Sequence, residues 1–356
     1  MRKSKYLILS SFYIEFNDDL TKIINMKYSF WPQNVLDLDR FNNLKSINGL
    51  FDYKYLNFIF LPSSVTRLKH HIFNGFKLKF LDLSNYINLK IIDSKAFYNN
   101  KIECVKLPIN IEMILEDAFV KNQIKRLDLS QCIKLKSIKK SAFYENNIKY
   151  LKLPENIEEI HEDAFKSNEI KYLTLPQGIR LIGLNAFWAN EIKHIDFSKC
   201  INLKYIGGAS FEANKIKQLK LPKNIEKIEW CAFSNNKIEI LDLSQCIKLQ
   251  TIELSFNNNL IKTLSLPKNI EIIQNFAFRT NQIEILDLSN CIKLKEIKNA
   301  SFGNNPLKEI KILDNIEIEY HDNNDIWNNF VICYLKNNKK SGDYKLENNE
   351  WKWYPL

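Results

Sequence analysis

Glycine is scarce in this sequence, and the loops that depend on it are missing. The chain has 356 residues but only 8 glycines, and no Gly-rich loop of the kind that cradles phosphate groups. No Ser-His-Asp or Cys-His arrangement has the spacing of a nucleophilic site. We therefore predict that the protein is not an enzyme and that it has no cofactor.

Paired cysteines and long apolar runs are missing as well. None of the seven cysteines belongs to a Cys-x-x-Cys pair, which zinc ribbons and thioredoxin-type sites require. No apolar run reaches the ~18 residues that a membrane-spanning helix needs. The start, MRKSKYLILSSFYIEFNDD, is basic and then apolar, but it has no small-residue cleavage site. We expect an intracellular, cytoplasmic protein with reduced thiols rather than a secreted one, and no membrane partner.

What the chain does have is an internal repeat. Segments 148–169 and 170–191 read IKYLKLPENIEEIHEDAFKSNE and IKYLTLPQGIRLIGLNAFWANE, and 124–147 reads IKRLDLSQCIKLKSIKKSAFYENN. Units with LxLP have 22 residues and those with LDLS usually 24, and about twelve units cover residues 33–312. A period of 20–29 residues with this Leu pattern is typical of a leucine-rich-repeat solenoid.

Each unit has a pattern that predicts its own geometry. The alternating I-x-x-L-x-L pattern predicts a strand in which Leu151 and Leu153 point inward. Pro154 ends that strand, and the later Ala and Phe of each unit fill the interior. An Asn three residues after the Phe recurs in ten units. Because Asn tolerates the left-handed conformation and its amide can bond to neighbouring backbone, we expect it to close a short helical turn before the next strand.

The tandem pattern LPxNIExIxxxAFxxN resembles the BspA-type leucine-rich repeat, a family of bacterial surface proteins, protozoan parasites and giant DNA viruses. The richness in Ile, Asn and Lys resembles chains from AT-rich genomes, which fits a protozoan or viral source, so the chain could act in a host cell or virion. The resemblance implies an α/β-type right-handed superhelix with a parallel sheet on its concave face. Its convex side would carry short turns or helical turns, and both ends would be capped. It also implies protein binding or adhesion, and no catalytic residues.

Four cysteines occupy one repeat position, where Phe41 and Tyr86 stand in earlier units: Cys132, Cys200, Cys246 and Cys291. A position shared by Phe, Tyr and Cys is a packing position. Cysteines two or three coils apart are roughly 10–14 Å distant, beyond the reach of a disulfide. We predict buried thiols and no metal site.

Residues 157–165, IEEIHEDAF, place His161 beside Glu162 and Asp163 and so suggest chemistry. The same positions hold Leu115-Glu116-Asp117 and Glu229-Trp230-Cys231 in other units. Because the repeat lets these positions vary freely, we interpret the cluster as a solvated turn.

The outward strand positions are the candidate binding surface. One column alternates Asp and Lys, as at Lys106, Asp128 and Lys152, and such a self-neutralised ladder argues against a nucleic-acid partner despite the net charge of +10. The adjacent column carries aromatic and cationic side chains of the kind enriched at binding hot spots. Aromatic side chains on a sheet face also stabilise cross-strand pairs, which is the alternative interpretation. The candidate binding residues are Phe58, Phe80, Arg126, Tyr150, Tyr172 and His194.

The two ends depart from the repeat. Residues 1–32 are interpreted as an N-terminal cap, with a small interaction motif as the alternative. Residues 33–312 form the solenoid and residues 313–356 a C-terminal cap, with a short helix over 325–338 and a hairpin turning at 347–349. We therefore expect a protein-binding scaffold, with a surface adhesin, or an adaptor that recruits a substrate through its N-terminal segment, as alternatives.

Overall fold

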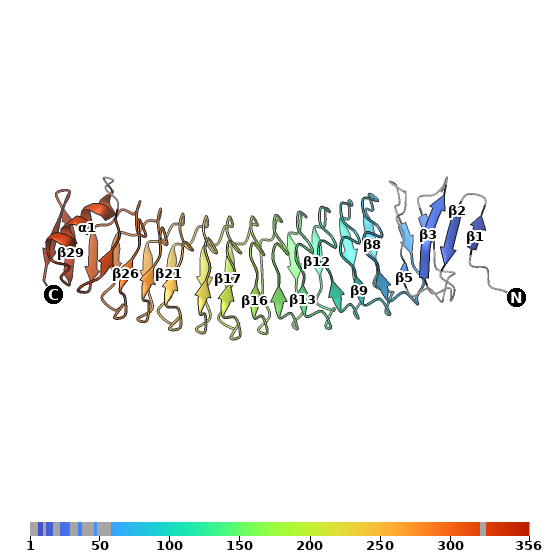
Figure 1. Ribbon diagram of the computed structural model, residues 1–356, viewed down its shortest axis with the longest axis horizontal. Coiled ribbons are helices and arrows are strands. Elements are labelled where there is room, and N and C mark those ends of the chain that lie inside the picture. The colour runs from blue at the N-terminus through green and yellow to red at the C-terminus, as the bar shows by residue number, and fades with distance from the viewer. Residues whose placement is uncertain are drawn as a thin grey trace. The chain divides into compact units, whose positions relative to one another are not determined.

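The computed structural model describes residues 59–320 and 325–355 in full, together with the backbone of Phe58 and of five earlier strands. The chain divides into two compact units, Met1–Tyr172 and Leu173–Leu356. Each unit is a stack of coils in which short parallel strands form two ladders (Figure 1). The part of the chain described contains one α-helix, near the C-terminus.

We call the first ladder of the first unit its long-strand sheet, because its strands have three residues. These strands pair in parallel in two groups, β4–β6 and β8–β10–β12–β14. From β8 onward their middle residues, such as Leu81 and Leu127, are buried, and the residues on either side of them point outward. The predicted alternation is therefore confirmed. The strands are β4 (Val35–Asp37), β6 (Phe58–Phe60), β8 (Phe80–Asp82), β10 (Cys104–Lys106), β12 (Arg126–Asp128) and β14 (Tyr150–Lys152).

A second ladder, the short-strand sheet, occupies the part of each coil where sequence predicted only turns or helical turns. Each strand has two residues, and from β7 onward the second is a buried Ile or Leu. β-Branched side chains suit a pleated, half-buried surface, which explains a sheet at this position. The strands of the first unit are β5 (Ser46–Ile47), β7 (Arg67–Leu68), β9 (Ile91–Ile92), β11 (Met113–Ile114), β13 (Ser137–Ile138) and β15 (Glu159–Ile160).

The N-terminal segment adds three antiparallel strands to the short-strand sheet. They are β1 (Tyr6–Leu9), β2 (Phe12–Phe16) and β3 (Lys22–Tyr28). The backbone of β3 pairs in parallel with β5, through Lys22 with Ser46 and Ile23 with Ile47. The predicted capping by residues 1–32 depends on side chains outside the described residues and stays a prediction.

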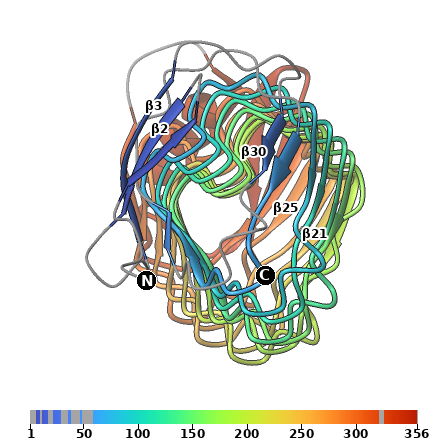
Figure 2. The same cartoon turned by 90° about the vertical axis from the view of Figure 1, so that its right-hand side faces the viewer.

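The second unit repeats the two ladders, and Figure 2 views its coils nearly end-on with β21 and β25 along one wall. Its long strands are β17 (His194–Asp196), β19 (Gln218–Lys220), β21 (Ile240–Asp242), β23 (Thr263–Ser265), β25 (Ile285–Asp287) and β27 (Glu309–Ile312). Its short strands are β16 (Leu181–Ile182), β18 (Tyr205–Ile206), β20 (Lys227–Ile228), β22 (Thr251–Ile252), β24 (Ile272–Ile273), β26 (Glu296–Ile297) and β28 (Glu317–Ile318).

Stacked phenylalanines form the core of both units. In the first unit the rings of Phe97, Phe119, Phe143 and Phe165 follow one another with centroids 5.2–5.6 Å apart. A second stack runs from Phe187 to Phe302 in the second unit, with spacings of 5.3–5.8 Å. The small Ala that precedes most of these rings is also buried, so the coils approach closely at this corner.

The recurring asparagines bind coil to coil through their side chains. The Asn122 amide nitrogen donates to the carbonyl of Phe97, one coil earlier, at 2.9 Å, and to that of Phe119 at 3.1 Å. Its oxygen accepts the N–H of Ile102. The expected bonding of the Asn amide to neighbouring backbone is confirmed. The left-handed residue, however, is the preceding Lys121, with φ 57°, and not the Asn. A buried amide has one oxygen and two N–H groups to satisfy, and this position satisfies them all.

The C-terminal region closes on the last coil with α1 (Ile326–Lys336), β29 (Gly342–Glu347) and β30 (Glu350–Tyr354). The predicted helix and hairpin are confirmed, with Asp325 at the N-cap position. The Phe stack continues from Phe302 to Trp327, with centroids 5.1 Å apart, and Phe330, Tyr334 and Tyr344 are buried beside it. β29 pairs antiparallel with β27 and covers its free edge.

Candidate functional site

Five outward side chains form one unbroken row across the long-strand sheet of the first unit. Backbone pairing aligns them in the order Phe80, Cys104, Arg126, Tyr150 and Tyr172. The row is open to solvent, with Phe80 59% and Tyr172 70% exposed. Large exposed aromatic groups are what a binding surface needs, because they bury much area when a partner covers them.

The centre of the row pairs an aromatic ring with two cations. The guanidinium carbon of Arg126 lies 4.6 Å from the centroid of the Tyr150 ring, and Lys152 Nζ lies 5.6 Å from it. The pKa of Lys152 is raised, mainly by its contact with Tyr150 and to a smaller extent by the charge of Asp128. The ammonium group of Lys152 therefore stays charged. Cation–π attraction favours this position of the ring.

The alternating Asp and Lys column is self-neutralised, as predicted. Lys106 Nζ lies 2.9 Å from Asp82 Oδ2, and Lys152 Nζ lies 3.9 Å from Asp128 Oδ2. The Ser84 hydroxyl and then Lys106 lower the pKa of Asp82 to about 2. Each Asp of an LDLS motif also accepts the N–H of the Ser two residues later, at 3.0 Å for Ser84. Asp82 therefore both shapes its turn and pairs with the next coil.

Not all of the predicted residues belong to this row. Phe80, Arg126, Tyr150 and Tyr172 are brought together in the first unit. His194 lies in the second unit on β17, opposite Gln218 of β19, and is exposed. Phe58 lies on β6, and its side chain is outside the described residues. Cys104 belongs to the same sequence column but was not among the candidate residues; it occupies the row between Phe80 and Arg126 and is exposed.

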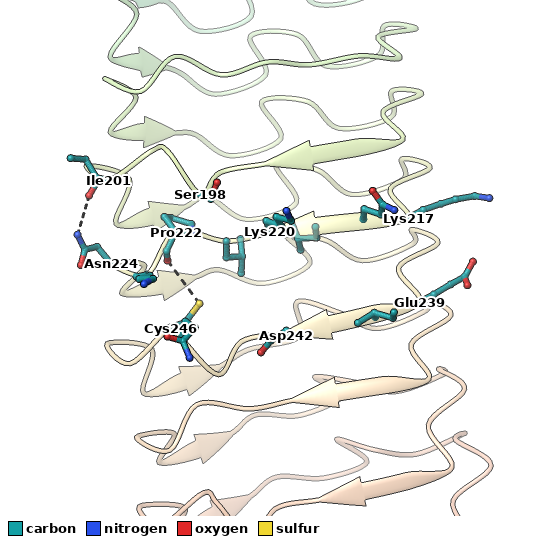
Figure 3. Close-up of a pocket in the computed structure, with 15 residues that line it drawn as sticks. Ser198, Ile201, Lys217, Lys220, Pro222, Asn224, Glu239, Asp242 and Cys246 are labelled. Atoms are coloured by element: carbon teal, nitrogen blue, oxygen red, sulfur yellow. Dashed lines mark hydrogen bonds between the residues drawn. The ribbon is translucent and has the colours of Figure 1, made fainter.

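The second unit has a groove on its long-strand sheet that the sequence did not indicate. Its volume is about 930 Å³, and it lies over β19 and β21 (Figure 3). Ile201 and Ile240, both 64% exposed, supply apolar walls, and Lys220 and Asp242 border it. These isoleucines occupy two different positions of the repeat unit. The shape of the coil brings them to the same groove, so comparing one position across the repeat units does not reveal it.

The repeated cysteines are buried single thiols, as predicted. Cys132, Cys200 and Cys246 place Sγ 3.7–3.8 Å from the carbonyl oxygen of a Pro in the preceding coil, and Figure 3 shows the contact of Cys246 with Pro222. Burial raises the pKa of each of these three thiols to about 11 and that of Cys291 to about 12. Such thiols are protonated at neutral pH and poor nucleophiles.

The His161 cluster has partners but no arrangement that holds a metal ion. His161 Nε2 lies 3.1 Å from Glu159 Oε2 and 3.3 Å from Lys139 Nζ, on the flank of the short-strand sheet. Within residues 59–320 and 325–355, no three His, Cys, Asp or Glu side chains converge as metal ligands. The helix in this part of the chain is also too short and too polar to cross a bilayer.

Stacked parallel coils with this repeat define a leucine-rich-repeat solenoid. The sequence matches the BspA type leucine rich repeat region in six copies over residues 45–168, 136–255 and 244–325, and the chain belongs to this family. No curated protein matches the chain.

Three solved structures illustrate what the chain is similar to. The leucine-rich effector YopM of Yersinia pestis is 19% identical, with 82% of this chain and 86% of that chain covered and a TM-score of 0.45. The pneumococcal vaccine antigen PcpA is 16% identical, with 94% and 96% covered and a TM-score of 0.46. A leucine-rich cell surface protein of Faecalibacterium prausnitzii is 16% identical, with 92% and 97% covered and a TM-score of 0.37. No function is carried over from them.

Proposed function

We propose that this protein is a non-catalytic scaffold that binds a protein partner through the long-strand sheet of its first unit. The observation that carries the proposal is the aligned row from Phe80 to Tyr172, whose two end residues are more than half exposed. Leucine-rich-repeat solenoids commonly present such a rigid surface to other proteins. The function needs no cofactor and no membrane partner, and we place it inside the cell.

The stiffness of the row supports recognition. Four of the row residues stand on strands and Tyr172 forms an isolated bridge to Tyr150. The strands β10 and β12 pair with neighbours on both sides. A partner therefore meets side chains that are already positioned and loses less conformational freedom on binding. It contacts the face through side chains rather than by adding a strand, because these inner strands have no free edge.

Site-specific crosslinking tests this function. A photoreactive benzoylphenylalanine at Tyr172 should crosslink to a partner protein in extracts of the producing cell. The same residue at Met113, which is 39% exposed on the short-strand sheet, is the matched control. The Tyr172 adduct should disappear when Phe80 and Tyr150 are both changed to Ala. Equal adducts from the two positions, or an adduct insensitive to these substitutions, would contradict the proposal.

The same experiment separates the alternatives. An adaptor working through residues 1–32 would give its adduct from a probe at Tyr13 rather than at Tyr172. An adhesin would be reached by a membrane-impermeant biotinylation reagent on intact cells. An intracellular scaffold would be labelled only after lysis.

A further inference from the structure

The long-strand face of the first unit carries a net positive charge, which the short-strand face of the same unit lacks. We define this face as the outward side chains of β8, β10, β12 and β14, the residue before each strand, and Lys171 and Tyr172. It holds seven basic and three acidic side chains, a net charge of +4. The basic residues are Lys79, Lys106, Lys125, Arg126, Lys149, Lys152 and Lys171, and the acidic ones are Asp82, Glu103 and Asp128.

Cross-coil ion pairs account for part of this charge and leave a cationic remainder. Lys106 pairs with Asp82, Lys152 with Asp128, Lys125 with Glu103 at 2.7 Å, and Lys149 with the bordering Glu169 at 3.3 Å. Four lysines are thus matched by four carboxylates. The three remaining positive charges belong to Lys79, Arg126 and Lys171. Each lies beside an aromatic residue of the row: Lys79 precedes Phe80, Arg126 contacts the Tyr150 ring, and Lys171 precedes Tyr172.

Two comparable faces of the molecule are close to neutral and do not share this excess. Around β7, β9, β11, β13 and β15 the short-strand face of the first unit holds seven basic and eight acidic side chains. Most are matched in pairs such as Arg67 with Asp93 and Lys140 with Glu162. The corresponding long-strand face of the second unit, from Lys193 to Lys311, holds six of each sign.

From this combination we infer that the long-strand face of the first unit binds an acidic, extended segment of a partner protein that also carries aromatic or aliphatic side chains. This inference rests on the proposed function and specifies the partner. The cations would pair with Asp and Glu of the segment, and Phe80 and Tyr172 would cover its apolar side chains.

The dimensions of the row set the length of the segment. Its five residues span four strand spacings, or roughly 19 Å, because neighbouring strands lie ~4.8 Å apart. An extended chain advances ~3.3 Å per residue, so about six residues cover the row. The segment runs across the strands, since the row does.

A single-stranded nucleic acid fits this face less well. Stacking requires open ring faces, but the Tyr150 ring already contacts Arg126 and Lys152. The phosphates of a polynucleotide would also meet Asp82, Glu103 and Asp128 along the same path. A peptide can place its acidic and apolar residues where the face needs them, whereas a polynucleotide carries a charge at every step.

Selection from a phage-displayed library of random peptides tests the inference. Peptides of about twelve residues, twice the length of the row, are selected on the immobilised full chain. Sequences that also bind the Tyr150→Ala, Tyr172→Ala double variant are discarded. We expect the enriched peptides to have a net negative charge and at least one Phe, Trp or Leu. Their affinity should fall as salt rises from about 0.05 to 0.5 M, because exposed charge pairs are screened.

Charge reversal supplies the matched comparison. Arg126→Glu with Lys171→Glu should weaken the best peptide about tenfold or more, since two attractive contacts become repulsive. Lys217→Glu with Lys262→Glu changes the protein charge equally on the neutral face of the second unit and should weaken it less than about twofold. Circular dichroism melting of each variant confirms that it is folded.

The outcomes separate this inference from the proposed function. Enriched peptides that are neutral or basic, yet still need Tyr150 and Tyr172, would overturn the acidic class and leave the scaffold function standing. A selection in which every enriched sequence also binds the Tyr150→Ala, Tyr172→Ala double variant, so that none is left, would overturn both. An oligothymidylate that binds more tightly than any selected peptide would overturn the inference in favour of single-stranded nucleic acid.

Discussion

The ring of Phe143 lies parallel to that of Phe119, with the two planes 3° apart and the centroids separated by 5.3 Å. The Phe165 ring stacks on the Phe143 ring from the next coil, with centroids 5.6 Å apart, and Phe143 is fully buried. One side chain per coil thus supports the coil before it and the coil after it. Loss of a ring from the middle of this stack leaves a cavity bounded by rigid neighbours.

Phe143→Ala should therefore lower the free energy of unfolding by about 3–5 kcal/mol, the range for truncating a buried aromatic residue. Urea denaturation followed by circular dichroism measures the loss. Phe80→Ala is the control, since Phe80 is 59% exposed and its truncation should cost less than about 1 kcal/mol. Similar losses for the two variants would show that the stack does not carry the stability assigned to it.

Asn122→Asp should destabilise the protein most at neutral pH. The substitution keeps the shape but replaces an N–H₂ group that faces the carbonyls of Phe97, Phe119 and Val120 with an oxygen. Burial beside these oxygens disfavours the carboxylate and raises its folded-state pKa. The variant then binds more protons when folded than when unfolded, so its stability relative to wild type falls as pH rises through the ordinary Asp range.

Thermal melts of wild type and variant between about pH 4 and pH 7 check this. The difference in melting temperature should grow with pH. A constant difference would mean that the carboxylate reaches solvent. The control is Asn202→Asp at an exposed turn position, which should leave the melting temperature nearly unchanged at both ends of the range.

Asp82 should lose its contribution to stability only in strong acid. The Ser84 hydroxyl and Lys106 lower its folded-state pKa from 3.8 to about 2. Its contribution is fully present above the unfolded pKa and disappears as pH falls through the folded value. The pair is exposed, so the effect stays below about 1 kcal/mol. Carbon-detected NMR titration of the carboxyl should show the low midpoint, and Ser84→Ala should raise it. A midpoint that ignores Ser84 would contradict this origin.

The four repeated cysteines should resist alkylation in the folded protein. Burial raises the pKa of the Cys246 thiol to about 11 and that of Cys291 to about 12, so little thiolate exists at pH 8. Cys104 is exposed and should react with iodoacetamide first. Peptide mass spectrometry before and after guanidinium treatment distinguishes them. Equal labelling of Cys104 and Cys246 in the native protein would contradict the burial.

Much of the fold was predictable because the repeat displays each packing position many times. The inward Leu of the long strands, the buried Phe and the packing role of Cys132 all followed from what a position tolerates across units. The short-strand sheet did not follow, because two-residue strands are shorter than any alternation that can be recognised. The backbone hydrogen bonds of the Asn122 amide were expected, but the left-handed residue was not: it is Lys121, a residue type that does not signal a left-handed backbone.

The candidate site was predictable in part. A column of the alignment places Phe80, Arg126, Tyr150 and Tyr172 in one row, since strand register follows the repeat. It does not show that Arg126 lies over the Tyr150 ring, because side-chain rotation is not periodic. The groove beside Ile201 and Ile240 is lined by residues from different positions of the repeat unit, so predicting it requires the geometry of the coil.

The asparagine side chains also bear on how such a chain can change over generations. Each one reaches back to the coil before it, as Asn305 does to Phe278 at 2.9 Å, so every coil arrives with the donors that join it to its neighbour. Recombination between gene copies of a coil can then lengthen or shorten the protein in steps of 22 or 24 codons, the lengths of segments such as 102–123 and 124–147. A single-codon insertion between Phe119 and Asn122 would instead break the register. Length variation among alleles of this gene should therefore come in whole coils.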